Sequence, residues 1–252
     1  MAKTIAQIKK EFEMAGREEL SELFAAYADD SRAGVAGLIR QYQKKEEEFQ
    51  KELARIEAMK VYEHRYGDLG LICGIDEAGR GPLAGPVVAG AVILPKDSRI
   101  LYLNDSKKLS EKKREELFDV IMEQAIAVGV GIVGPARIDE INILQATYEA
   151  MRQAIGKLGV VPQILLNDAV TIPEVTIPQV PIIKGDAKSV SIAAASIIAK
   201  VTRDRMMRQY DELMPEYGFA AHKGYGSAAH IEAIQRYGAS PIHRATFIKN
   251  FL

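Results

Sequence analysis

The chain has 252 residues, of which 48% are hydrophobic and 27% are charged, and its formal net charge is -1 at pH 7. This composition is typical of a globular protein, and the length suits one large domain or a domain with an appendage. The near-neutral charge excludes a globally basic nucleic-acid binder, so any such partner must meet positive charge that is concentrated locally. No apolar run approaches the roughly 20 residues that span a bilayer, so no membrane association is expected. The single cysteine, Cys73, rules out an internal disulfide, and with no signal-like N-terminal segment we expect a cytoplasmic location.

Residues 1–68 differ from the rest of the chain. Charged stretches over 5–28 and 33–62 carry apolar residues at helical spacing, and a polar turn separates them. This pattern predicts a helical N-terminal extension over 1–68, followed by a main domain over 69–252. The extension is either a solvated helical structure packed on the core or an additional surface for nucleic acid or a partner. Its acidic residues slightly outnumber its basic ones, which does not favour DNA binding.

From residue 71 onward, strand-like and helix-like segments alternate. Runs rich in apolar residues predict five strands, over residues 71–76, 87–94, 125–133, 161–166 and 180–183. Helical periodicity and capping signals predict helices over residues 111–123, 138–158, 189–210 and 227–237. This order predicts an α/β fold, a mixed sheet with helices on its faces. The helix over 189–210 is almost wholly apolar as far as Ala199, so we expect it to be buried against the sheet.

Two adjacent acids, Asp76 and Glu77, end the first predicted strand. Carboxylates at the tip of a buried strand are costly to keep ionised unless positive charge lies beside them. A hard divalent cation is the natural candidate, because such ions take oxygen ligands. Asp168 and Asp186 also follow apolar strands, and sites in open sheets collect at strand ends and helix N-termini. We therefore expect the four acids to meet in one cleft.

The residue types also indicate which metal and which reaction the cleft would serve. Three or four carboxylates without a nearby His or Cys pair suit Mg²⁺ or Mn²⁺ rather than Zn²⁺. Two such ions about 3.5–4 Å apart would activate a water and stabilise the leaving oxygen of a phosphodiester. Each acid alone has a structural alternative, since Asp168 can cap a turn, Asp186 can cap a helix, and an Asp-Glu pair can be solvated. Their joint placement after apolar strands favours the metal site.

Four further segments suit contact with nucleic acid. Arg80, in a glycine frame, suits a phosphate or a sugar backbone. Lys107 lies in a polar loop before a helix and can meet phosphates or belong to a solvated face. Tyr225 stands between two glycines and suits stacking on a sugar or base, or else packs at a helix entry. The basic segment 240–244 ends the core and either touches substrate or folds back.

Four segments taken together closely resemble bacterial ribonuclease HII, a type 2 ribonuclease H. They are residues 74–82, residues 105–109, the run Lys184-Gly185-Asp186 with the small residues after it, and residues 222–226. The resemblance covers roughly residues 71–247 and does not extend to the helical segment 1–68. It implies a ribonuclease H-like fold: a five-stranded mixed sheet flanked by helices, followed by a helical C-terminal part.

The resemblance implies roles for the four acids. Asp76, Glu77, Asp168 and Asp186 correspond to the family's catalytic acids, which bind two Mg²⁺ or Mn²⁺ ions. The chain departs from the family at one point, because many members have glycine after the third acid and this chain has Ala169. The assignment of Asp168 therefore rests on its position after a strand.

The resemblance also implies how the substrate is recognised. The residues Gly79, Arg80 and Gly81, called here the Gly-Arg-Gly turn, would recognise the 2′-hydroxyl at an RNA–DNA junction. Glycine permits the close backbone approach that this requires. Tyr225 would stack on the deoxyribose that follows the ribonucleotide. Arg80, Lys107 and Lys184 would contact phosphates and position the duplex without reading its sequence.

The implied activity is endonucleolytic cleavage of RNA in RNA–DNA hybrids and incision 5′ to a single ribonucleotide in duplex DNA. The products would carry 3′-hydroxyl and 5′-phosphate ends. RNA–DNA hybrids and ribonucleotide-containing duplex DNA are the expected partners of a monomer, and no protein partner such as a replication clamp is indicated.

Three alternatives remain. A ribonuclease HIII-like nuclease usually carries a β-sheet platform as its N-terminal domain, so the helical segment 1–68 and the Gly-Arg-Gly turn argue against it. A non-catalytic hybrid-binding module with the same fold would be favoured by the loss of any of the four acids. A polymerase or recombinase relative explains the acids but neither the Gly-Arg-Gly turn nor Tyr225.

Overall fold

The computed structural model describes residues 3–251, and it divides into two compact units. The first unit ends at Arg55 and the second begins at Ile56. Residue 68, where the sequence pattern changes, lies further along the chain, in the short 3₁₀ helix η2 (Gly67–Leu69). A domain boundary at residues 68 and 69 stays a prediction.

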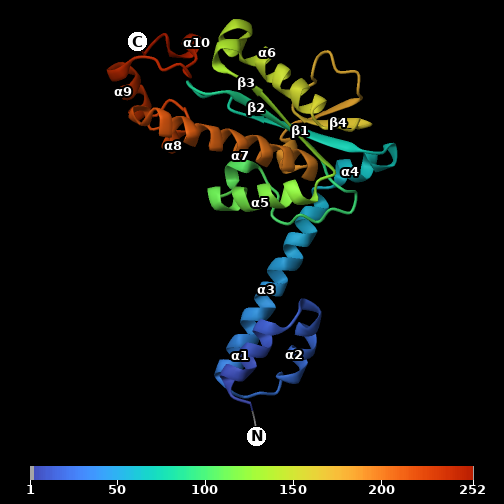
Figure 1. Ribbon diagram of the computed structural model, residues 1–252. Helices are drawn as coiled ribbons and strands as arrows, with labels where there is room; N and C mark the ends of the chain where they lie inside the picture. The colour runs from blue at the N-terminus through green and yellow to red at the C-terminus, as the bar shows by residue number, and fades with distance from the viewer. Residues whose placement is uncertain (1–2, 252) are drawn as a thin grey trace. The chain divides into compact units, whose positions relative to one another are not determined.

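The first unit is helical and has its own apolar core. Its elements are α1 (Ile5–Met14), η1 (Arg17–Glu19), α2 (Leu20–Ala26) and most of α3 (Ala33–Ala58) (Figure 1). The ring of Phe12 lies at the centre of this core, with the rings of Phe24, Tyr27 and Tyr42 around it. Thr4 caps α1 and exchanges hydrogen bonds with Gln7, which satisfies free N–H groups of the first turn.

The second unit is built on one five-stranded sheet of order β3-β2-β1-β4-β5. The central strand β1 pairs antiparallel with β2 and parallel with β4. The outer pairs are antiparallel for β2 with β3 and parallel for β4 with β5. The predicted five-stranded mixed sheet is therefore confirmed. The strands are β1 (Ile72–Ala78), β2 (Val87–Ile93), β3 (Ala127–Val133), β4 (Ile164–Asp168) and β5 (Gln179–Ile182).

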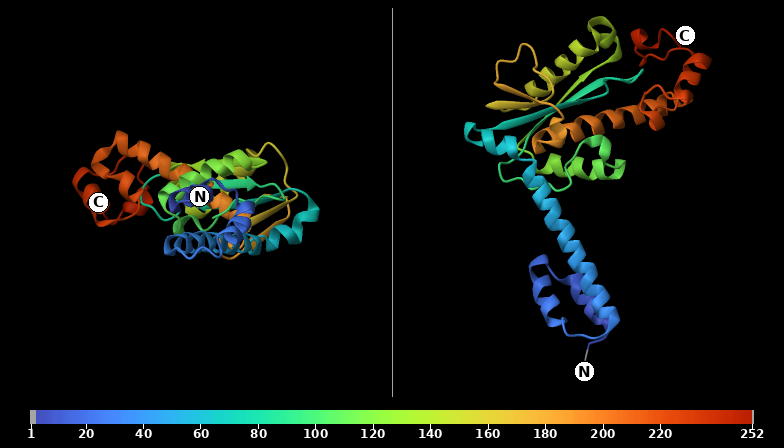
Figure 2. Two further views of the ribbon diagram at one scale, coloured as in Figure 1. Left: turned by 90° about the horizontal axis from the view of Figure 1, so that it is seen from below. Right: turned by 180° about the vertical axis from the view of Figure 1, so that it is seen from behind.

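Helices cover both faces of this sheet. One face packs against α6 (Pro135–Gly156), and the other packs against α7 (Val190–Leu213), with α5 (Glu111–Gln124) beyond it (Figures 1 and 2). Glycines in the strands allow the close approach: a Cβ added at Gly131 would lie 1.8 Å from the Ala150 carbonyl oxygen of α6. A Cβ at Gly90 would lie 2.5 Å from the Ala195 carbonyl oxygen of α7. The first half of α7 is therefore buried against the sheet, as predicted.

None of the helices within residues 3–251 is long and apolar enough to cross a membrane.

The remaining elements are short helices before the sheet, in its loops and at the C-terminus. These elements are α4 (Val61–Tyr66), η3 (Ser106–Lys108), η4 (Gly185–Ala187), η5 (Pro215–Tyr217), α8 (Phe219–His222), α9 (Ala228–Tyr237) and α10 (Ala245–Ile248).

Candidate functional site

A cleft of about 490 Å³ lies where β1 runs into the Gly-Arg-Gly turn. Three other parts of the chain complete it: the segment formed by η3 and the first turn of α5, one stripe of α7, and the loop before α9. The residues that line it are Asp76, Glu77, Ala78, Gly79, Arg80, Gly81, Ser106, Lys107, Arg114, Ser196, Lys200, Arg203 and Tyr225. The cleft thus brings together seven of the residues predicted from the sequence, and Asp168, Asp186 and Lys184 do not line it.

Asp76 is a buried acid that lines the cleft, and the residue is 6% exposed. Burial raises the pKa of Asp76 well above its ordinary value, and the negative charge of Glu77 raises it further. A hydrogen bond from Ser196 acts in the opposite direction. Its Oδ1 also accepts the Glu77 N–H at 2.7 Å. Neither contact supplies a full positive charge, so no cation balances the carboxylate form of Asp76.

Glu77 is the neighbouring acid and does have a cationic partner. Burial raises the pKa of Glu77, while the charge of Arg80 lowers it in part. The Arg80 Nη1 lies 3.3 Å from the Glu77 Oε1. Arg80, which the sequence predicts to contact phosphate, is exposed and forms an ion pair with Glu77 in this structure.

Asp168 and Asp186 lie beside this pair and affect it electrostatically. Asp168 is the last residue of β4, and the negative charge of Asp168 raises the pKa values of Asp76, Glu77 and Asp186. Its Oδ1 accepts the Gly185 N–H at 2.7 Å, which ties β4 to the loop that carries Asp186. Burial is the largest cause that raises the pKa of Asp186, followed by the charge of Asp105. The four acids share one electrostatic neighbourhood.

The donor chemistry of this neighbourhood fits a hard divalent cation, since its acids offer oxygen ligands and lack a matching positive charge. Within residues 3–251, however, no group of three or more His, Cys, Asp or Glu side chains is gathered closely enough to hold a metal ion. The assignment of all four acids as metal ligands therefore stays a prediction.

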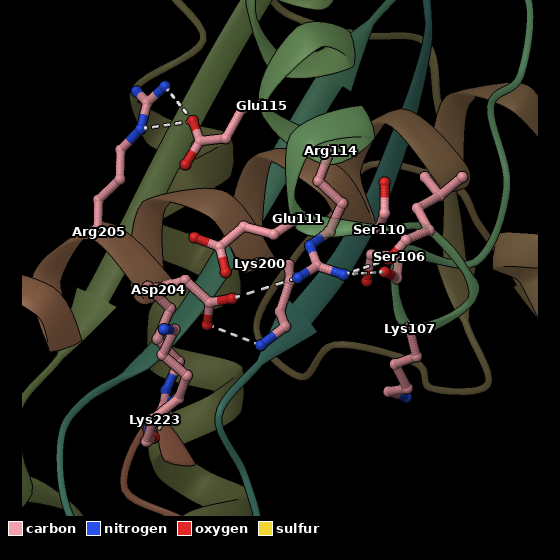
Figure 3. Close-up of polar contacts among 12 residues, drawn as sticks. Ser106, Lys107, Ser110, Glu111, Arg114, Glu115, Lys200, Asp204, Arg205 and Lys223 are labelled. Carbon is pink, nitrogen blue, oxygen red and sulfur yellow. Dashed lines mark hydrogen bonds and ion pairs between the residues drawn. The ribbon is translucent and has the colours of Figure 1, made fainter. Parts of the chain in front are cut away.

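Lys200 and Arg114 supply positive charge to another part of the cleft wall, and both contact Asp204. The Lys200 Nζ lies 2.7 Å from the Asp204 Oδ1, and the Arg114 Nη2 lies 3.8 Å from the Asp204 Oδ2 (Figure 3). Arg114 also donates hydrogen bonds to the carbonyls of Ser106 at 3.0 Å and Leu109 at 2.5 Å. Two cations thus share one buried carboxylate, which leaves the wall net positive and fixes the loop that carries Lys107.

Several residues of the cleft were missed by sequence reasoning. Ser196, Lys200 and Arg203 line it from α7, and their spacing of four and three residues places them on one helical stripe. That spacing is a signal the sequence does carry. Asp105 does not line the cleft, but its charge raises the pKa of Asp186, and the sequence pattern gives no sign of this.

The structure also shows where two further predicted segments lie. Tyr225 is 46% exposed at the cleft, so it is not packed in the core. The C-terminal basic segment folds back onto the turn, because Arg244 is fully buried and donates hydrogen bonds to the Gly79 and Arg80 carbonyls.

Comparisons with known proteins identify relatives of the chain. Residues 73–250 match the family described as Ribonuclease HII, and residues 4–67 match the family described as Ribonuclease HII N-terminal domain. Ribonuclease HII of Lachnoclostridium phytofermentans is 64% identical over 246 residues, which cover 98% of this chain and 97% of that protein. Ribonuclease HII of Clostridioides difficile is 53% identical over 252 residues, with 99% of each chain covered. The crystal structure of ribonuclease H2 from Pyrococcus horikoshii superposes with a TM-score of 0.61 at 31% identity, over 72% of this chain and 96% of that one.

Proposed function

The chain belongs to the ribonuclease HII family and is a metal-dependent ribonuclease H, and from this membership we propose how its cleft acts on nucleic acid. It hydrolyses the RNA strand of RNA–DNA hybrids and incises duplex DNA 5′ to single ribonucleotides, leaving 3′-hydroxyl and 5′-phosphate ends. One observation carries the proposal: the buried carboxyl of Asp76, which has no cationic partner, lines the same cleft as Glu77, the Gly-Arg-Gly turn and an exposed tyrosine.

Asp76, Glu77, Asp168 and Asp186 are the proposed holders of two Mg²⁺ or Mn²⁺ ions. The raised pKa values of Asp76, Glu77 and Asp186 support this role, because buried like charges favour a bound cation. Such ions, when bound, activate a water and stabilise the leaving oxygen of the phosphodiester.

The Gly-Arg-Gly turn and Tyr225 are the proposed readers of the ribose–deoxyribose junction. A Cβ added at Gly81 would lie 3.9 Å from the Tyr225 ring, so the two readers are neighbours. Discrimination of RNA from DNA at one position requires contact with the 2′-hydroxyl, and the tyrosine ring offers a stacking surface. Lys107 in the cleft and the exposed Lys184 outside it are proposed to contact phosphates.

The ribonuclease HIII-like alternative is less well supported, because residues 4–67 match the N-terminal domain of ribonuclease HII and the first unit is helical. The enzyme is proposed to act as a monomer on nucleic acid and to reside in the cytoplasm. Its single cysteine, which is buried and free, suits a reducing compartment.

The direct test uses duplex DNA with one ribonucleotide and a continuous RNA–DNA hybrid, each with Mg²⁺ or Mn²⁺. The wild-type protein should cut 5′ to the ribonucleotide, and mapping of the product ends checks the position. Asp76→Asn should abolish the cut, whereas Asp97→Asn, at an exposed loop position, should not. Substantial metal-dependent cleavage by Asp76→Asn would remove Asp76 from the reaction.

A further inference from the structure

Two arginines are buried immediately behind the Gly-Arg-Gly turn. Arg203 of α7 is 1% exposed and Arg244, just before α10, is 0% exposed. Neither guanidinium forms an ion pair with any residue in the described range 3–251. Burial lowers the pKa of both side chains, to about 9 for Arg244. A buried charge without an ion-pair partner is costly, and apolar residues of similar volume often serve stability better, so these arginines call for a role beyond stability.

Arg244 holds the carbonyls of the turn. Its Nη2 donates to the Gly79 carbonyl at 2.5 Å, and its Nη1 donates to the Arg80 carbonyl at 2.8 Å. Its Nε and Nη2 both donate to the Gly85 carbonyl, at 3.0 and 2.9 Å. The planar guanidinium therefore fixes the orientation of two successive peptide planes in the turn.

The orientation of these carbonyls also determines where the amides point. In a trans peptide the C=O and the following N–H point in opposite directions, so the N–H groups of Arg80 and Gly81 point away from Arg244. Neither N–H donates to an acceptor anywhere in residues 3–251, although both residues line the cleft. Two unpaired backbone donors at a cleft are available for an oxygen of a ligand.

Arg203 joins the turn to the loop that carries Tyr225. It donates from Nε to the Pro86 carbonyl at 2.9 Å and from Nη2 to the Ala84 carbonyl at 3.0 Å. Its Nη1 donates to the Lys223 carbonyl at 2.9 Å, and its Cζ lies 6.0 Å from the centroid of the Tyr225 ring. One side chain thus connects the residues after the Gly-Arg-Gly turn with the residues before the tyrosine.

We propose that Arg244 and Arg203 are positioning residues for junction recognition. Arg244 orients the N–H groups of Arg80 and Gly81 toward the 2′-hydroxyl, and Arg203 sets their separation from Tyr225. The pair thereby determines the preference for a ribonucleotide that is followed by a deoxyribonucleotide. The inference rests on the proposed function, in which the Gly-Arg-Gly turn and Tyr225 read this junction.

The test compares kcat/KM on two substrates, duplex DNA with one ribonucleotide and a continuous RNA–DNA hybrid. A hybrid offers many cleavage registers, so misplacement of the junction readers should harm the single-ribonucleotide substrate more. Arg244→Lys keeps the charge and loses the planar fork. It should lower the ratio of the two kcat/KM values about tenfold or more, since small misplacements in a site cost up to about 100-fold. Arg208→Lys, on the same helix as Arg203 but paired with Glu115, is the matched control and should leave the ratio unchanged.

Global destabilisation reduces the active fraction equally for both substrates, so a purely structural role would leave this ratio at the wild-type value. That result, with a lowered melting temperature by circular dichroism, would overturn the proposal.

Arg203→Lys provides a second route if Arg244→Lys does not fold. Arg203 is proposed to act through Tyr225. The double variant Arg203→Lys/Tyr225→Ala should therefore have nearly the same ratio of kcat/KM values as the single variant Tyr225→Ala. A full additive loss in the double variant would contradict this coupling. Wild-type protein that fails to cut at the junction would instead overturn the proposed function itself, so the two failures are distinguishable.

Discussion

Asp76 pairs high burial with an unmet charge, and this has a consequence for stability. The pKa of Asp76 is raised in the folded protein, mainly by burial and by Glu77. Its contribution to stability is therefore fully present below the unfolded-state pKa, near 3.9, and is lost as the pH rises through the folded-state pKa. At neutral pH without metal, the carboxylate of Asp76 opposes folding, and a bound cation relieves this opposition.

Asp76→Asn should therefore increase the free energy of unfolding of the metal-free protein at pH 7, although it abolishes cleavage. Urea unfolding in the presence of a chelator measures the difference, which should shrink as the pH approaches 4. A variant that is less stable than wild type at pH 7 would show that the carboxylate is already compensated within the fold.

Ala169 occupies a backbone conformation that favours glycine, with a φ of 56°. The left-handed region costs a residue with a Cβ roughly 1–2 kcal/mol. Ala169→Gly should therefore stabilise the protein by about 1 kcal/mol, reduced somewhat by the greater freedom of glycine in the unfolded chain. Ala229→Gly, at an exposed position of α9, should instead destabilise it by about 0.5–1 kcal/mol. Thermal melts of both variants give the two signs, and equal destabilisation would rule out relief of strain at Ala169.

At the scale of elements, periodicity predicted the existence and type of the sheet strands well and their ends less well. The fourth strand was expected over 161–166 and is Ile164–Asp168, because Val161 is exposed and Pro162 has no N–H for a ladder bond. The shift places Asp168 inside the strand, opposite Ile182 of β5 and one residue after Asn167, which pairs with Ile75 of β1. Apolar character alone does not reveal where pairing begins.

The break in α6 is a second feature that periodicity does not reveal. Asn142 has a φ of 67° within the helix, and its Oδ1 accepts the N–H groups of Leu144 and Gln145. It acts as an internal N-cap for the second half of α6. Asn142→Ala should lower the free energy of unfolding by about 1–2 kcal/mol, because it loses the cap and keeps the positive φ. Asn142→Gly tolerates that φ, so it should lower the free energy of unfolding by less than Asn142→Ala does. Urea unfolding of both variants measures the two losses. A smaller loss for Asn142→Ala would contradict this account.

For the whole molecule, the sequence predicts those residues of the site that lie together in short contiguous segments. Asp76, Glu77 and the Gly-Arg-Gly turn come from one such segment, and Tyr225 comes from another. Arg203 and Arg244 act on backbone carbonyls up to 165 positions away in the chain, and only the folded chain brings these partners together. The sequence indicates where chemistry-bearing residues lie, while the residues that orient them depend on tertiary contacts.

The charge of the cleft differs from that of the whole chain. The formal net charge of the chain is -1 at pH 7, whereas one wall of the cleft is net positive. Binding of a hybrid by the inactive Asp76→Asn variant should therefore weaken with salt through a local set of phosphate contacts. Lys107→Ala should reduce the slope of log K against log salt concentration by about one, and equally for different sequences. Lys157→Ala, just after α6 on the opposite face of the sheet, should leave the slope unchanged. Fluorescence anisotropy titrations over a salt series measure both slopes, and a Lys107→Ala slope equal to that of Lys157→Ala would exclude a phosphate contact at Lys107.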